Sequence, residues 1–163
     1  MGTFIIILLI SAALLGGALY FGQQRANRLI AEGKMIKRDG EFWNFAEIFT
    51  LTGVNYERVL NAVNNTDFSE YKVTQYPDNG DRKEILFKSS YEWNAVISMQ
   101  SEENDVYKYR FEFVAWNTHR GLPLRSDTMN MMETKVEKMF LGLDPHATVE
   151  MVENKLKTRQ RLF

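Results

Sequence analysis

The stretch from Val106 to Asn117, VYKYRFEFVAWN, decides the fold class. The residues that share one face of an extended chain here are Tyr107, Tyr109, Phe111, Phe113 and Ala115. Those on the opposite face include Lys108, Arg110 and Glu112. Strict alternation of apolar and charged residues predicts a strand with one buried and one hydrated face, which is typical of an antiparallel sheet.

Four further strands are expected before this one, at residues 47–54, 70–76, 84–89 and 92–100. A helix is predicted after Asn55, which suits an N-cap, and a second after Asp127, with Gly142 as its stop. The segment from Asp144 onwards reads most simply as a third helix, with Val149, Val152 and Leu156 facing inward. The expected fold is α+β: an N-terminal transmembrane helix, then a two-layer domain with an antiparallel sheet of about four to five strands covered by helices.

The residues from Phe4 to Phe21 carry no charge. As a helix rising about 1.5 Å per residue, they would extend roughly 27 Å, close to the hydrocarbon thickness of a bilayer. Tyr20 and Phe21 would lie where interfacial aromatic residues are enriched, and Arg25 follows directly. We therefore predict a single-pass membrane anchor.

Two other interpretations of this segment stay open. A removed secretory signal normally has positive charge before its apolar run, whereas only Met1, Gly2 and Thr3 precede this one. A pilin-like N-terminus carries a glutamate early in its helix, and the apolar run contains none. The absence of cysteine excludes a lipoprotein signal. An uncleaved signal-anchor fits the sequence best.

Lysine and arginine set the expected orientation, because positively charged flanks stay in the cytoplasm. No lysine or arginine precedes the apolar run. The basic residues that follow it, and that we expect at the membrane surface, are Arg25, Arg28, Lys34, Lys37 and Arg38. We expect the bulk of the chain in the cytoplasm. The alternative is an extracytoplasmic domain, because so short a neutral N-terminus carries little orienting signal.

Small residues recur at a spacing of four within the apolar run. They are Ala12, Ala13, Gly16 and Gly17. This spacing gives one helix face a flat stripe against which another helix can pack, either a second copy or a larger membrane protein. The plainer interpretation is that glycine and alanine are common in membrane helices.

Three regions follow from these patterns: a transmembrane anchor at 1–22, a basic juxtamembrane stalk at 23–40, and a soluble α+β domain at 41–163 with a basic C-terminal tail. The 163 residues have a formal net charge of -1 and are 45% hydrophobic, a globular composition. Nucleic-acid binding requires a basic stripe, so we expect no nucleic-acid partner.

Catalytic constellations are scarce in this sequence. Without cysteine there is no thiol nucleophile or thiolate metal site, and only two histidines, His119 and His146, are present. No glycine-rich phosphate-binding run and no Gly-x-Ser-x-Gly elbow occur. We expect no cofactor and no metal. A hydrolase built on His119 and Ser126 is a distant third hypothesis.

The loop between the clearest strand and the second helix offers the best binding candidates, because loops on rigid scaffolds often carry binding. The candidate residues are Trp116, His119, Arg120 and Arg125, together with Met131 on the helix. The basic side chains suit an anion or an acidic partner, and Met131 is predicted to point away from the buried stripe. The sequence thus favours a membrane-anchored, non-enzymatic binding or scaffold domain, with an exported domain as the alternative.

Overall fold

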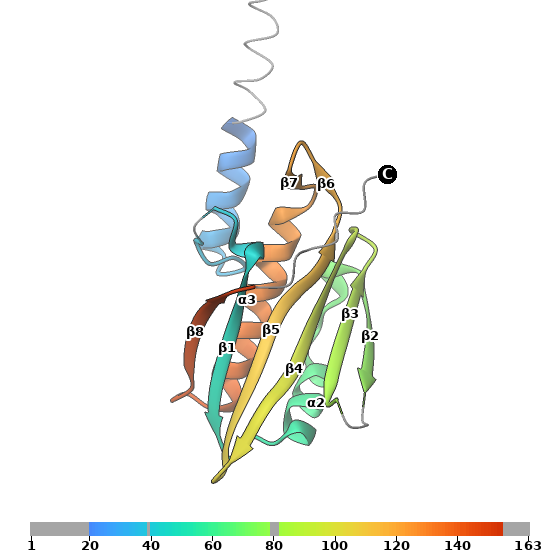
Figure 1. The fold of residues 1–163 in the computed structure, drawn as a ribbon. Helices are drawn as coiled ribbons and strands as arrows, with labels where there is room; N and C mark the ends of the chain where they lie inside the picture. The colour runs from blue at the N-terminus through green and yellow to red at the C-terminus, as the bar shows by residue number, and fades with distance from the viewer. Residues whose placement is uncertain (1–19, 39, 79–81, 155–163) are drawn as a thin grey trace, which may run out of the picture. The chain divides into compact units, whose positions relative to one another are not determined.

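Figure 1 shows the fold in a computed structural model, which describes residues 20–38, 40–78 and 82–154. The chain forms two compact units, Met1–Lys37 and Arg38–Phe163. In the first unit, residues 20–31 are helical and Arg28 Nε pairs with Glu32 Oε1 at 2.7 Å.

Most of the predicted membrane anchor lies outside the described residues, as do the four small residues from Ala12 to Gly17 and the tail at 155–163. Within the described part, no helix combines the length and the apolar character needed to cross a membrane. The anchor therefore remains a prediction from sequence.

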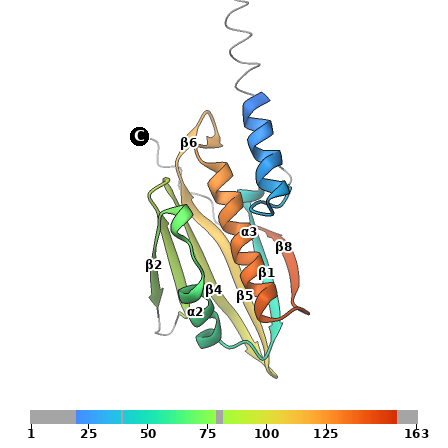
Figure 2. The same cartoon turned by 180° about the vertical axis from the view of Figure 1, so that it is seen from behind.

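The second unit is an α+β fold built on a six-stranded antiparallel sheet. In spatial order its strands are β2 (Val73–Asp78), β3 (Glu84–Ser89), β4 (Trp93–Glu103), β5 (Val106–Trp116), β1 (Phe45–Thr52) and β8 (Thr148–Glu153). Two helices, α2 (Tyr56–Asn65) and α3 (Ser126–Leu143), cover one face of the sheet (Figures 1 and 2). The remaining short elements are η1 (Phe42–Asn44), η2 (Ser69–Tyr71), β6 (Thr118–His119) and β7 (Leu122–Pro123).

Aromatic side chains fill the space between the sheet and α3. Phe140 of α3 stacks on Phe49 of β1, with ring centroids 4.3 Å apart, and on Tyr109 of β5 at 5.5 Å. All three rings are fully buried. The Tyr109 hydroxyl donates to the Val54 carbonyl at 2.8 Å, so its polar atom is paired inside the core. The strand that decides the fold class thus buries the face that its alternation predicts.

Several local expectations are confirmed. β3 has the predicted bounds, and β5 ends one residue before the predicted Asn117. The Asn55 side chain caps α2 by accepting the Arg58 backbone N–H at 3.0 Å. The sequence also predicts a turn at residues 77–81, but Pro77 and Asp78 are the last residues of β2, and residues 79–81 lie outside the described residues.

The prediction of a third helix after Asp144 is wrong, because residues 148–153 form the edge strand β8. β8 pairs with β1 in antiparallel register, Ala46 opposite Val152, and so supplies the β1 edge with hydrogen-bond partners. This strand makes the sheet six-stranded instead of four- to five-stranded. The helical spacing of Val149, Val152 and Leu156 gave no indication that β1 had an unpaired edge for this segment to join.

The ends of α3 also differ from expectation. The N-cap position is Arg125, without a side-chain cap, and Asp127 lies in the first turn. Gly142 lies inside the helix, which ends at Leu143. The Asp144 carboxylate then accepts the backbone N–H groups of Thr52 and His146, each at 2.9 Å, and these bonds hold the pKa of Asp144 below its usual value.

Candidate functional site

A buried cluster of ionisable side chains lies where the chain enters the second unit. The Arg38 side chain is 5% exposed and inserts between β1 and α3. Its Nη2 donates to Glu47 Oε1 at 2.9 Å and to Glu137 Oε2 at 2.8 Å. Its Nη1 donates to Asn130 Oδ1 at 3.1 Å and to Thr134 Oγ1 at 2.9 Å. One guanidinium therefore joins the first strand to two turns of α3.

A third carboxylate completes this Arg38 cluster. Glu133 Oε2 lies 3.2 Å from Arg38 Nε, yet outside hydrogen-bond geometry, and the side chain is 1% exposed. Glu47 Oε2 is likewise buried without a hydrogen-bond partner among the described residues. Three carboxylates thus face a single cation, and two of their oxygens are left without a donor in this part of the chain. Such an arrangement favours the neutral, protonated form of at least one carboxyl group.

Burial raises the pKa of Glu47 to about 7, against the opposing attraction of Arg38. Burial, reinforced by the negative charge of Glu47, raises the pKa of Glu133 to about 9. At neutral pH Glu133 therefore holds its proton, and the cluster approaches electrical neutrality around Arg38. The carboxyl groups of the Arg38 cluster are enclosed together with their own cation. The cluster therefore suits fastening β1 to α3 better than contact with a substrate.

Sequence reasoning placed Arg38 at the membrane surface, but its side chain is enclosed in the protein. A signal for this cluster was available. Glu47 occupies the same alternating face of β1 as Phe49 and Leu51, so an inward-facing carboxylate required a cation. Of the other residues predicted at the surface, Arg28 and Lys34 both pair with Glu32, at 2.7 and 3.9 Å, while Arg25 and Lys37 are exposed.

The predicted binding loop is a small hairpin of β6 and β7, with His119 opposite Leu122. Arg120 and Gly121 form its turn, both with positive φ, 51° and 83°. His119 and Arg120 are exposed at this tip.

The two remaining loop candidates lie at the base of the hairpin. The Arg125 guanidinium lies over the Tyr91 ring at 4.5 Å, and its Nε is 3.7 Å from Asp127 Oδ1. Trp116 pairs with Trp93 across β5 and β4 and is partly exposed. Arg125 and Trp116 therefore help to position the hairpin, while His119 and Arg120 present its tip.

Met131 lies in a different environment from the one expected. It is 8% exposed, within a run from Thr128 to Thr134 in which every residue is buried. Its side chain is packed in the protein and does not offer the adaptable surface that the sequence suggested. The helical stripe predicted only one buried face of α3, whereas the residues from Thr128 to Thr134 are buried on all sides of the helix.

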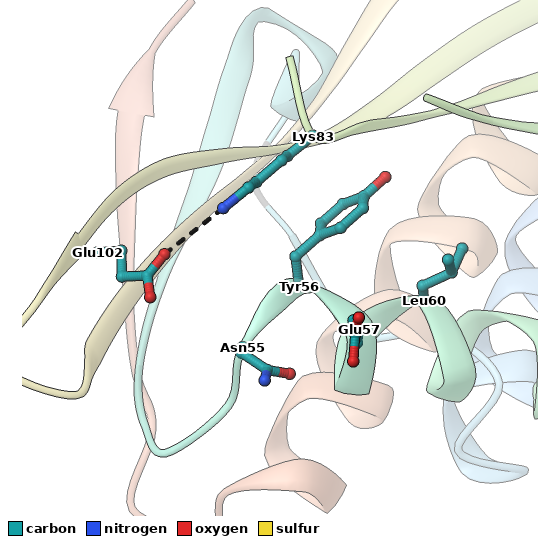
Figure 3. A pocket seen from close by; sticks show the side chains of 6 residues that line it. All are labelled: Asn55, Tyr56, Glu57, Leu60, Lys83 and Glu102. Carbon is teal, nitrogen blue, oxygen red and sulfur yellow. Dashed lines mark hydrogen bonds and ion pairs between the residues drawn. The ribbon is translucent and has the colours of Figure 1, made fainter. Parts of the chain in front are cut away.

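A pocket of about 490 Å³ opens beside the start of α2 (Figure 3). Its lining consists of Asn55, Tyr56, Glu57, Leu60, Lys83 and Glu102. Lys83 Nζ and Glu102 Oε2 pair across it at 3.5 Å, and both side chains are more than 40% exposed. The Tyr56 hydroxyl is directed to the Asp78 and Glu84 carbonyls, both at 3.0 Å, so it ties α2 to the β2–β3 hairpin. The pocket contains a solvated ion pair and a structural tyrosine.

Across residues 20–38, 40–78 and 82–154, no group of three histidine, cysteine, aspartate or glutamate side chains could hold a metal ion. Ser126 begins α3 and His119 ends β6, and the hydrolase hypothesis built on them stays a prediction. Comparison of the chain with protein-family models, curated protein sequences and solved structures found no match.

Proposed function

We propose that this chain is a membrane-anchored, non-enzymatic domain that binds or scaffolds a partner at the membrane face. The observation that carries the proposal is the order of its parts. An uncharged run of membrane-spanning length and a basic flank lead into a folded unit whose first residue, Arg38, is fastened between β1 and α3. The buried charge of Arg38 therefore fastens the first residue of this unit to its sheet and to α3.

The Arg38 cluster also supports the non-enzymatic part of the proposal. Strongly perturbed carboxyl groups often mark active sites, but structural ion networks perturb them as well. Here Glu47 and Glu133 are 4% and 1% exposed and surround an arginine of the same unit. The raised pKa values of these two carboxyl groups follow from their structural role beside Arg38. We therefore assign binding to the surface of the domain and not to this cluster.

The location is tested by separating membranes from the soluble fraction and washing them with alkaline carbonate. The full chain is expected in the washed pellet, whereas recovery in the wash would contradict an embedded anchor. Orientation is tested with fusions at the C-terminus. A cytoplasmic domain gives a fluorescent protein fusion and an inactive alkaline phosphatase fusion; strong phosphatase activity would contradict it.

The alternative is an exported domain, at the cell surface or released. It stays open because the neutral residues before the apolar run carry little orienting signal of their own. Sequencing the N-terminus of the mature protein separates the two proposals. A first residue beyond Gly22 supports export with cleavage, and a retained Met1 or Gly2 supports the anchor.

A further inference from the structure

The β6–β7 hairpin exposes apolar side chains next to positive charge. Leu122 is 59% exposed and Leu124 is 51% exposed. Arg120 is exposed in the turn between the two strands. The sequence from Phe113 to Ser126 contains two arginines and a histidine but no acidic residue. This tip combines the two features by which a protein segment contacts an anionic lipid surface: apolar insertion and electrostatic attraction.

The fold holds this tip in place. The Leu124 backbone N–H donates to the Asn117 carbonyl at 3.1 Å, and the Asn117 N–H donates to the Glu92 carbonyl at 3.0 Å. Arg125, directly after the hairpin, lies over the Tyr91 ring at 4.5 Å. The leucines are therefore presented by a hydrogen-bonded hairpin seated on the sheet.

The hairpin also lies at the end of the sheet where the chain enters this unit. β1 begins at Phe45 and runs antiparallel to β5, so the start of β1 lies near the end of β5, from which the hairpin continues (Figure 1). Phe42 of the incoming segment packs edge-on against Phe113 of β5, with centroids 6.4 Å apart. A tether that leads from a membrane therefore enters this unit at the end that carries the hairpin.

The charges at the two ends of β5 favour the same orientation of the domain at a membrane. Before β5, Glu102 and Glu103 end β4 and Asp105 lies in the β4–β5 turn, with Lys83 as a partner of Glu102. The hairpin that follows β5 carries Arg120 and Arg125; the acidic groups beside its base are Asp127, near Arg125, and Glu92, which accepts from the Asn117 side chain at 3.1 Å. An anionic surface therefore attracts the hairpin end and repels the opposite turn.

We propose that the β6–β7 hairpin is a second membrane contact, with Leu122 and Leu124 in the interfacial region of an anionic bilayer and Arg120 against the lipid phosphates. The inference rests on the proposed membrane anchor and adds a docked orientation of the domain to it. The tip would hold the acidic β4–β5 turn away from the lipid, where a binding partner can reach it.

The chain contains no cysteine, so a single introduced thiol is a unique label position. In the full chain, His119→Cys places a nitrobenzoxadiazole dye opposite Leu122 and leaves both leucines in place. Glu103→Cys, at the other end of β5, is the matched control. Both proteins are reconstituted in vesicles of phosphatidylcholine alone or with phosphatidylglycerol. We expect a blue shift, and quenching by nitroxide-labelled lipid, at position 119 in the anionic vesicles only.

Two sets of variants in the His119→Cys background test the chemistry. Replacing both leucines by serine should abolish the blue shift. Arg120→Asn keeps a residue that tolerates positive φ and removes the charge; the docked population should fall roughly fivefold, the factor that matches about 1 kcal/mol per basic residue near an anionic surface. Arg120→Lys should retain docking.

Three results would overturn the inference: a water-exposed dye at position 119 in both kinds of vesicle, an equal shift in neutral and anionic vesicles, or a shift that occurs only in native membranes and indicates a protein partner. Failure of the anchor is distinguishable. If the labelled chain does not remain with the vesicles after a carbonate wash, the proposed function itself fails; if it remains with a water-exposed hairpin, only this inference does.

Discussion

At the residue scale, Arg38 links β1 to α3 within the second unit. It forms four hydrogen bonds to side chains on β1 and α3 while its own side chain is 5% exposed. A buried ion cluster contributes little net stability compared with an apolar core, but removal of one member leaves uncompensated charge. The positive charge at this position is therefore needed as long as the carboxylates are present.

Replacing Arg38 by methionine is expected to destabilise the fold by about 3–5 kcal/mol, because Glu47 and Glu137 lose their cation in a buried setting. Urea unfolding followed by circular dichroism measures the change. The neighbouring, exposed Lys37→Met is the matched control and should lie within about 0.5 kcal/mol of the natural protein. Equal stability of the two variants would mean that the Arg38 cluster does not fasten the unit.

At the element scale, the β6–β7 hairpin and α3 place glycine in opposite conformations. Gly121 has φ of +83° in a two-residue turn, where a Cβ is strained even though open space surrounds it. Gly142 lies inside α3 with no atom within 4 Å of an added Cβ and no positive φ. The same substitution should therefore have opposite effects at the two positions.

Gly121→Ala is expected to weaken the hairpin by about 1 kcal/mol, because an L-residue is disfavoured at this backbone conformation. Faster hydrogen exchange of the Leu124 amide, which bonds the Asn117 carbonyl, reports the change. Gly142→Ala should instead stabilise the unit by roughly 0.5–1 kcal/mol, because alanine restricts the unfolded chain. A stabilising Gly121→Ala would show that the turn does not have the φ values described.

Element prediction succeeded where one local rule acted alone. Alternation located β5, and the Asn55 cap located the start of α2. It failed at β8, because apolar residues at Val149 and Val152 fit a helix as well as an edge strand. The choice depends on the unpaired edge of β1, which is about 100 residues earlier in the chain and can be recognised only once the sheet is assembled.

At the scale of the whole molecule, the buried carboxyl groups make stability depend on pH. Glu133 has a folded-state pKa of about 9, above its usual value of 4.5. The folded state then binds more protons than the unfolded state between these two values. The stability that its neutral form contributes is complete below about pH 4.5 and is lost as pH rises towards 9. Glu47, with a pKa of about 7, acts in the same direction over the lower part of this range.

Glu133→Gln should therefore match the natural protein in stability near pH 5 and exceed it by at least about 1 kcal/mol near pH 9, because glutamine keeps the neutral shape without a proton to lose. Thermal unfolding at a series of pH values gives the difference. Glu150→Gln on the exposed part of β8 is the control and should show no such trend. If the stability difference between Glu133→Gln and the natural protein shrinks as pH rises, Glu133 is not protonated in the folded state at neutral pH.

The candidate site shows how far the sequence alone predicts contacts between distant parts of the chain. The sequence located the loop from His119 to Arg125, since glycine and proline next to basic residues mark a surface loop. It did not reveal that Arg125 stacks on Tyr91, that Met131 is enclosed, or that Leu122 and Leu124 stand exposed beside Arg120. Each of these depends on segments that are distant in sequence and meet only in the folded unit.

The sequence by itself determined the α+β class, the antiparallel character of the sheet and the uncharged N-terminal run, because alternation, capping and hydropathy are local properties of the chain. The tertiary structure alone decided the sixth strand and the burial of Arg38. A free strand edge and a buried carboxylate each require a partner, and which segment supplies that partner depends on contacts across the assembled fold.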